Sequence, residues 1–188
     1  MIKSRKDLRF FLKEDAKRNG IKNLFRYRIG LIGNRENCHI YRYIRCLRFC
    51  EYYFNNSDSL INKFLYRVYK YNLGRLSLKY NISVRLNSCG YGLRIMHIGG
   101  GTRVGVLKAG NYCGFNVGSL IGTNGSEDSR PTLGDYVAFG PGAKAFGKIT
   151  IGNNVFVAPN AVITKDIPDN VIVGGVPAKI IKEKLTHL

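Results

Sequence analysis

The chain has 188 residues, enough to bury a sizeable hydrophobic core in one domain with an extension, so it needs no disulfide framework. Its 30 Lys and Arg residues against 12 Asp and Glu residues give a net charge of +18, of which +13 lies in residues 1–80. Such a basic region could attract a polyanion or an anionic membrane face, or it could be an ordinary solvated surface. No apolar run approaches the length of a membrane span, and the charged start does not resemble a signal peptide, so we expect a cytoplasmic protein.

Residues 1–80 carry apolar side chains at helical spacing, which predicts three or four amphipathic helices ending near Gly74. The first helix is expected to begin at a capping pair formed by Ser4 and Asp7. Aromatic stripes at this spacing belong more often to a core or an interface than to a ligand site. We therefore assign the region to oligomerisation or to acceptor binding.

The cysteines are five in number, lack any CxxC spacing and are scattered between apolar residues. This pattern predicts reduced thiols in a reducing compartment for Cys38, Cys46, Cys50, Cys89 and Cys113.

A period of six residues dominates the second half of the chain. Every sixth residue from Leu133 is apolar: Leu133, Phe139, Ala145, Ile151, Val157 and Ile163. The residues four positions further on are apolar as well: Val137, Ala143, Ile149, Val155, Ala161 and Ile167. A six-residue period fits neither an α-helix nor simple strand alternation. It predicts a parallel β-helix in which three hexads form one triangular coil with the apolar side chains pointing inward.

The repeat extends back through Phe115, so the β-helix is predicted to begin near Ile82. It is interrupted by the polar, glycine-rich stretch 122–131, which predicts a loop leaving the coil at a functional face. The expected organisation is a basic α-helical region at 1–80, a β-helix domain at 81–182 and a C-terminal tail at 183–188.

Three features together resemble a known family. They are the hexads, the stretch Gly90-Tyr-Gly-Leu-Arg-Ile-Met-His97-Ile-Gly-Gly-Gly101, and the ending Lys165-Asp-Ile-Pro-Asp-Asn-Val-Ile-Val-Gly-Gly-Val-Pro-Ala-Lys179. The chain resembles the serine acetyltransferase-like branch of the hexapeptide-repeat acyltransferases, and within it the O-acetyltransferases of capsule, exopolysaccharide and lipopolysaccharide gene clusters. The resemblance implies a left-handed coil, against the general right-handed rule for parallel crossovers. It also implies acetyl-CoA as donor and a homotrimer, or a dimer of trimers, with active sites between neighbouring prisms.

His97 is similar in position to the catalytic histidine of that family. An imidazole suits the removal of a proton from a hydroxyl because its pKa lies near neutral pH. The resemblance implies direct transfer, with backbone N–H groups stabilising the oxyanion. Of the other histidines, His39 is expected at the helical surface and His187 next to the C-terminus.

The family pattern also suggests which residues contact acetyl-CoA. Gly122 and Thr123 match the stretch near the thioester. The small corner residues that would lie beside the pantetheine arm are Gly140, Pro141, Ala158 and Pro159. The lysines that would contact the phosphates are Lys144, Lys165 and Lys179.

Two departures from the serine acetyltransferase pattern concern the acceptor site. Met96 and Arg130 stand where those enzymes have an aspartate and a second histidine, and the aspartate that orients the imidazole would fall near Asn81 or Ile82. We therefore expect a sugar hydroxyl of a surface polysaccharide unit or activated sugar as acceptor. The candidates for orienting His97 are Asn81, a loop carboxylate from Glu127 or Asp128, and a backbone carbonyl.

Several alternatives remain open at this stage. They are serine O-acetylation, acetylation of an amino sugar nitrogen, and a non-catalytic polyanion-binding β-helix. A zinc enzyme on this fold would need three histidines from adjacent coils, and only His97 lies in the predicted β-helix, so no metal is expected. Nucleic acid is not an expected partner, whereas peripheral contact with an anionic membrane face is left open.

Overall fold

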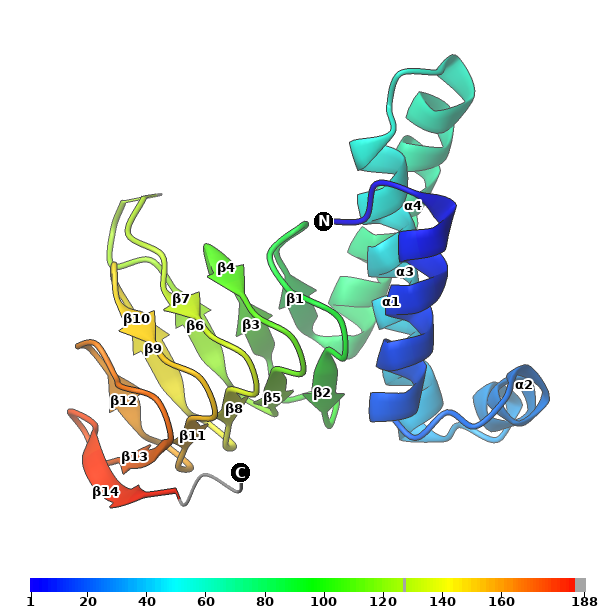
Figure 1. Cartoon of the computed structure of the whole chain (residues 1–188). Helices are drawn as coiled ribbons and strands as arrows, with labels where there is room; N and C mark the ends of the chain where they lie inside the picture. Colours follow the sequence, from blue (N-terminus) through cyan, green and yellow to red (C-terminus); the bar gives the residue numbers. More distant parts are fainter. Residues whose placement is uncertain (127, 185–188) are drawn as a thin grey trace.

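The computed structural model describes residues 1–126 and 128–184, so Glu127, His187 and most of the predicted tail lie outside the described residues. Within them, α-helices precede a parallel β-helix, which confirms the predicted fold class (Figure 1). The helices are α1 (Arg5–Arg18), α2 (Leu24–Ile32), α3 (Glu36–Asn55) and α4 (Leu60–Tyr80). The predicted capping pair is present, because Ser4 and Asp7 form a reciprocal capping box at the start of α1.

The β-helix has three faces, each formed by one sheet of stacked short strands. The first sheet has the order β1 (Ile82–Val84), β3 (Thr102–Val104), β6 (Leu120–Gly122), β9 (Lys144–Phe146) and β12 (Val162–Ile163). The second has the order β10 (Thr150–Ile151), β7 (Thr132–Leu133) and β4 (Lys108–Ala109). The third has the order β14 (Lys179–Glu183), β13 (Val171–Gly174), β11 (Phe156–Val157), β8 (Ala138–Phe139), β5 (Gly114–Asn116) and β2 (Arg94–Met96). Pairing is parallel throughout, except that β14 returns antiparallel to β13 and extends to Glu183, one residue into the predicted tail.

The hexad positions form the core of the β-helix. All twelve apolar residues of the two sets are buried, and Phe115 stacks on Phe139 of the next coil with ring centroids 5.7 Å apart. At one corner, a ladder of Asx side chains joins successive coils. The backbone N–H of Asn111 donates to Asp135 at 2.7 Å, and the N–H of Asp135 donates to Asn153 at 2.8 Å. These bonds satisfy corner amides that the strands leave unpaired.

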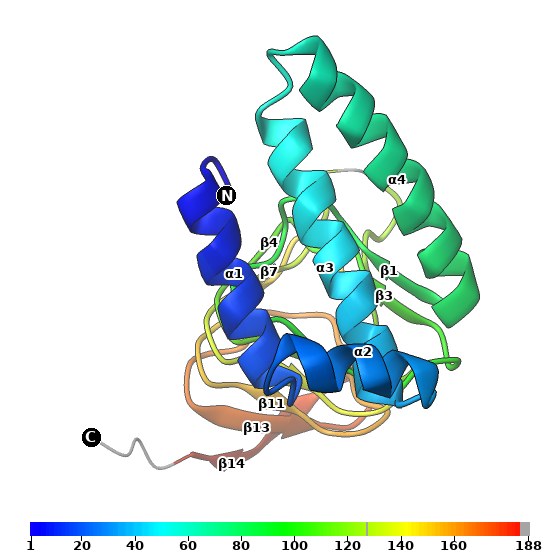
Figure 2. The same ribbon diagram turned by 90° about the vertical axis from the view of Figure 1, so that its right-hand side faces the viewer.

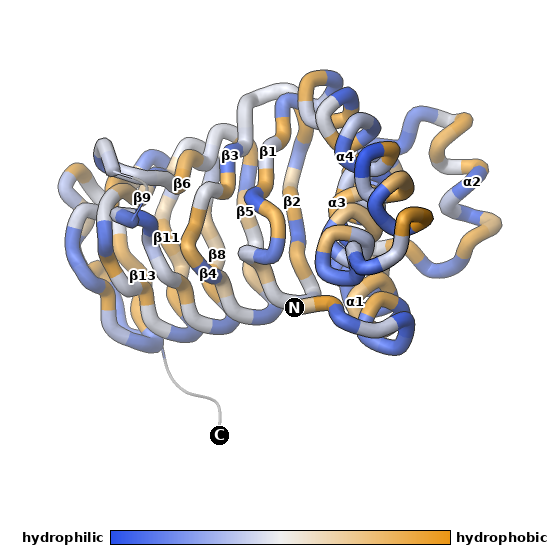
Figure 3. Tube along the Cα trace, turned by 90° about the horizontal axis from the view of Figure 1, so that it is seen from above, coloured by the Kyte–Doolittle hydropathy of each residue, from blue (hydrophilic) through white to orange (hydrophobic). Residues whose placement is uncertain are grey.

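The helices cover the first coil, so both parts of the chain share one core (Figure 2). Ile44 and Leu47 of α3 are fully buried and belong to the same hydrophobic cluster as Ile82 and Leu93 of the β-helix. Viewed from above, the coils run away from this end, while α2 projects from the opposite side of the helical layer (Figure 3). No helix within residues 1–126 and 128–184 combines the length and apolarity required to span a membrane.

The last helix is longer than predicted. α4 runs through Gly74 and ends at Tyr80, where Asn81 adopts the left-handed conformation with φ of 54°. A glycine inside a helix costs about 1 kcal/mol relative to alanine. Here Leu73 and Leu76 on either side of it pack against the core cluster, and this packing offsets the cost. The prediction of a helix end near Gly74 was therefore wrong.

Candidate active site

His97 lies in the corner that joins β2 to β3. Five residues separate Met96 from Thr102, whereas only two separate the equivalent residues Asn116 and Ser119 of the next coil. The extra length lets the corner protrude, and His97 adopts a φ of 66°. Its side chain is 64% exposed, so the imidazole projects from the coil into solvent.

The imidazole is held by a carboxylate from the helical region. Nδ1 of His97 lies 3.1 Å from Oε2 of Glu36, the first residue of α3, and the other carboxylate oxygen accepts from the N–H of Ile98 at 3.0 Å. Because a carboxylate only accepts hydrogen bonds, the proton of a neutral imidazole must be on Nδ1. This tautomer leaves the lone pair of Nε2 available to accept a proton from a bound hydroxyl, as a general base requires.

Of the side chains predicted to orient His97, Asn81 and Asp128 do not contact its ring. The side chain of Asn81 donates instead to the carbonyl of Gly99 at 3.4 Å. Asp128 makes no hydrogen bond with His97 in the described part of the loop, and Glu127 lies outside the described residues. Glu36 was missed because it is distant in sequence. The signal that could have found it is charge, since Glu36 is the only acidic residue between residues 16 and 50.

A buried ion cluster fixes α3 on the first coil. The Nε of Arg48 donates to Asp15 of α1 at 2.8 Å, its Nη1 donates to Glu51 at 3.0 Å, and its guanidinium also donates to the carbonyls of Cys89 and Gly90. Burial alone would lower the pKa of Arg48, but the charges of Asp15 and Glu51 outweigh this and raise it. The cluster joins α1, α3 and the β-helix, and so fixes the helix that carries Glu36.

Eight of the nine predicted acetyl-CoA residues lie along two edges of the first sheet. His97 lies at the edge where the strands of this sheet begin. The predicted residues at the same edge, in later coils, are Gly140, Pro141, Lys144, Ala158 and Pro159. Those at the opposite edge, after β6 and β12, are Gly122, Thr123 and Lys165. Strands of two or three residues separate the edges, which is roughly 10 Å at the usual rise. Lys179 begins β14 and pairs with Gly174. One chain therefore brings His97 together with only part of this set.

Small residues at the His97 edge have a structural reason as well. A Cβ on Gly140 would fall 2.8 Å from the backbone nitrogen of Pro159 in the next coil. The stacking of coils thus requires glycine here, independently of any ligand.

The predicted acceptor residues are also divided between the two edges. Met96 directly precedes His97 at the end of β2, and Asn81 reaches the same corner through Gly99. Arg130 instead lies at the opposite edge, where its Nη1 donates to the carbonyl of Gly105 at 2.9 Å. There it lines a cavity of about 560 Å³ together with Gly122 and Thr123. Over residues 1–126 and 128–184, no group of three or more His, Cys, Asp or Glu side chains is placed to hold a metal ion.

Comparison with known proteins finds similarity to serine acetyltransferases. No family model matches the chain. The serine acetyltransferase of Synechococcus elongatus is 36% identical over 95 residues, which cover 49% of this chain and 38% of that protein. The serine acetyltransferase of Buchnera aphidicola from Schizaphis graminum is 31% identical over 132 residues, 65% of this chain and 51% of that protein. The chain thus spans about half or less of the length of these relatives.

Solved structures show the same fold over nearly the whole chain. The serine acetyltransferase of Neisseria gonorrhoeae has a TM-score of 0.74 at 23% identity, covering 97% of this chain and 69% of that one. The structure of the gonococcal enzyme in complex with serine has a TM-score of 0.67 at 24% identity, and the match covers 95% of this chain and 71% of that one. The serine acetyltransferase of Brucella abortus in complex with coenzyme A has a TM-score of 0.68 at 24% identity, and the match covers 96% of this chain and 68% of that one. The chain therefore has the same fold as these structures, helical region included.

Proposed function

We propose that the chain is an acetyl-CoA-dependent O-acetyltransferase that uses His97 as its general base. Nε2 of His97 takes the proton of the acceptor hydroxyl as its oxygen attacks the thioester carbonyl. Backbone N–H groups stabilise the oxyanion, and the collapse of the intermediate releases CoA, which recovers the proton as a thiol. Glu36 keeps the imidazole in the required tautomer and stabilises its protonated form.

The observation that carries this proposal is the contact of 3.1 Å between His97 and Glu36 at the protruding corner of a hexapeptide-repeat β-helix. A solvent-exposed imidazole with a carboxylate on Nδ1 and a free Nε2 has the arrangement of a base and its orienting group. Acetyl-CoA as donor is supported by the serine acetyltransferase relatives and by the Brucella abortus structure that contains coenzyme A.

For the acceptor, the comparisons support serine better than the predicted saccharide. The relatives described above are serine acetyltransferases, and the gonococcal structure contains serine. A saccharide hydroxyl remains the second candidate because Met96 and Arg130 replace side chains of the serine acetyltransferase pattern. Both acceptors use the same proton transfer at His97, so the proposal for the base does not depend on the choice.

We further propose that the active site is completed by a second copy of the chain in a homotrimer. The support is the separation of the candidate residues, with His97 on one edge of the first sheet and Gly122, Thr123 and Lys165 on the other. A neighbouring β-helix packed beside this sheet brings the second edge of one copy close to the first edge of the next. Light scattering coupled to size-exclusion chromatography tests this, since a monomer that is fully active contradicts it.

The test of the proposed function is the release of CoA thiol from acetyl-CoA, measured with L-serine and with a panel of mono- and oligosaccharides. We expect one acceptor class to support turnover, and His97→Asn to lower kcat by about 10²- to 10⁴-fold, the usual contribution of a general base. Binding of CoA by calorimetry should be unchanged in that variant. Failure to bind CoA, or full activity of His97→Asn, would refute the proposal.

A further inference from the structure

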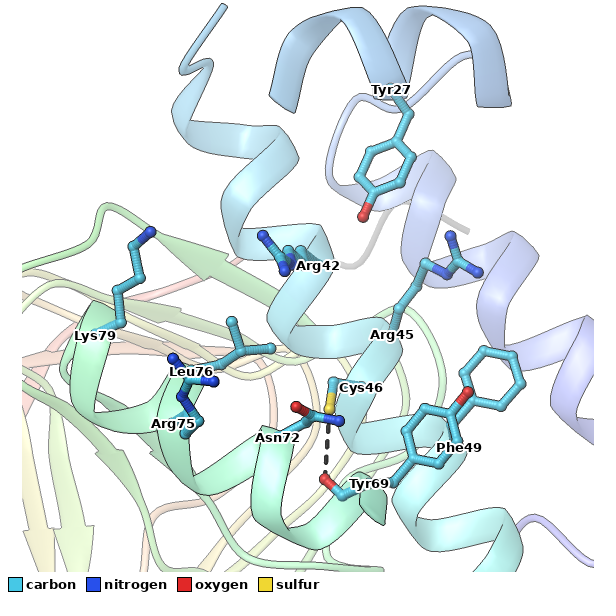
Figure 4. Close-up of a pocket in the computed structure, with 10 residues that line it drawn as sticks. All are labelled: Tyr27, Arg42, Arg45, Cys46, Phe49, Tyr69, Asn72, Arg75, Leu76 and Lys79. Carbon is cyan, nitrogen blue, oxygen red and sulfur yellow. Dashed lines mark hydrogen bonds between the residues drawn. The ribbon is translucent and has the colours of Figure 1, made fainter. Parts of the chain in front are cut away.

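A basic groove between α3 and α4 is not used by the chemistry proposed for His97. It has a volume of about 510 Å³, and its cations come from both walls: Arg42 and Arg45 from α3, and Arg75 and Lys79 from α4 (Figure 4). The two arginines are three residues apart and the α4 pair is four apart, so each pair lies on one helix face. The groove therefore concentrates four positive charges between two helices.

Within residues 1–126 and 128–184, no carboxylate compensates the charge of these cations. No carboxylate lines the groove, and within the described residues none of the four cations forms an ion pair. Arg48, also on α3, shows the contrast, because this structural arginine contacts two carboxylates. A cleft lined by charges of one sign focuses the electrostatic potential and raises the local concentration of anions, so this uncompensated set favours an anionic ligand.

The rest of the lining indicates the kind of anion. Phe49 and Tyr69 line the groove and stack with ring centroids 5.2 Å apart, and the guanidinium of Arg45 lies 5.8 Å from the Phe49 ring centroid. Guanidinium groups match the oxygens of phosphate in bidentate geometry, and a diphosphate places several negative charges in a compact group. The cavity volume lies within the usual range for small-molecule sites.

We propose that the groove between α3 and α4 binds an organic diphosphate. The phosphates lie between Arg42, Arg75 and Lys79, and the organic part of the ligand contacts the stacked aromatic pair Phe49 and Tyr69. This site does not depend on the function proposed for His97. Two sources share the required chemistry, namely the diphosphate of CoA and that of a nucleoside diphosphate or its sugar conjugate.

Titration calorimetry of the full chain with inorganic pyrophosphate tests the proposal. We expect saturable binding that is weakened at least about tenfold in the double variant Arg42→Gln/Arg75→Gln, because two charge-assisted contacts are lost. The matched control is Lys63→Gln/Arg67→Gln, which removes the same charge from exposed positions of α4 outside the groove and should bind as the parent does. Circular dichroism establishes that both variants are folded.

Three results would overturn the proposal: no binding of pyrophosphate by the parent, equal losses in the groove variant and the control, or equal affinity for orthophosphate and pyrophosphate. Competition then distinguishes the sources. Displacement of pyrophosphate by uridine diphosphate but not by CoA assigns the groove to nucleoside diphosphates, and the reverse assigns it to CoA. If neither compound displaces pyrophosphate, the groove does not accept a diphosphate that carries an organic group, and the proposal fails.

Discussion

Glu36 reaches His97 across 61 residues of sequence and places a carboxylate oxygen 3.1 Å from its Nδ1 atom. The second oxygen of the same carboxylate accepts the N–H of Ile98, so Glu36 holds the backbone of the protruding corner as well as the ring. A helix that could have served only for assembly thus takes part in arranging the candidate base.

The first prediction concerns this contact. Glu36→Gln should lower kcat at least about tenfold, but by less than the roughly 10⁴-fold seen when a buried triad carboxylate is replaced, because this pair is partly exposed. The carboxamide can still accept from Nδ1 of His97, but it carries no charge to stabilise the protonated imidazole, so the loss should appear in kcat. The KM for acetyl-CoA should change little.

The control for that experiment is Asp58→Asn, which removes one negative charge from the exposed α3–α4 connection. Glu36→Asp should recover part of the activity, because it restores a carboxylate at this position. An equal fall of kcat in Asp58→Asn contradicts the orienting role, since it would indicate only a general effect of lost negative charge.

The contrast between the hexads and Glu36 shows what sequence reasoning could reach. Each hexad residue is buried by its own coil and its neighbours, so the period of six was sufficient to predict the core of the β-helix. The contact of Glu36 with His97 depends instead on how α3 docks on the first coil. That docking is fixed by Arg48 with Asp15 and Glu51, a long-range cluster that leaves no local periodicity.

The second prediction concerns Arg48 in this cluster. Its side chain is fully buried, and Arg48→Met would leave Asp15 and Glu51 as uncompensated buried charges. We expect the free energy of unfolding to fall by about 3–5 kcal/mol, the usual cost of breaking a buried pair. Urea denaturation followed by circular dichroism measures this. The triple variant Asp15→Asn/Arg48→Met/Glu51→Gln should recover part of the loss, and a single variant as stable as the parent would show that the cluster is not fully desolvated.

The third prediction concerns the pH dependence of stability at His39. Burial, followed by the nearby charges of Lys79 and Arg42, lowers the pKa of His39 below its ordinary value of 6.5. Nδ1 of the ring lies 2.9 Å from the hydroxyl of Tyr80, a contact that the neutral ring can make. Because the folded pKa is below the unfolded pKa, the stabilisation is present above the unfolded pKa and is lost as pH falls through the folded value.

This effect should appear in His39→Gln, which keeps a hydrogen-bonding side chain but does not titrate. The loss of unfolding free energy between pH 7 and about pH 5 should be smaller in the variant than in the parent. In proton NMR, the signal of His39 is the histidine signal that is missing from His39→Gln. In the parent protein, this signal should titrate with a pKa below 6.5. A titration above that value would contradict the burial of the ring beside Lys79 and Arg42.

The last prediction concerns the five cysteines, all of which are free and buried. Burial raises the pKa of Cys46 and Cys89 to about 11 and that of Cys50 and Cys113 to about 12, and it raises the pKa of Cys38 as well. Since the thiolate is the reactive form, the native protein at pH 8 should react only slowly with a disulfide reagent, whereas the unfolded protein should release five equivalents.

The same low reactivity gives a low background in the thiol assay for CoA release. Cys46 and Cys50 lie on α3, and the thiol of Cys46 contacts the carbonyl of Tyr69 on α4. Cys46 lines the groove, whereas Cys50 does not and is fully buried, so rapid labelling of Cys50, identified by mass spectrometry, would show that α3 separates from its packing in solution. In that event the groove between α3 and α4 could not persist as a preformed site, and the pyrophosphate affinity would have to be measured on the labelled and unlabelled protein side by side.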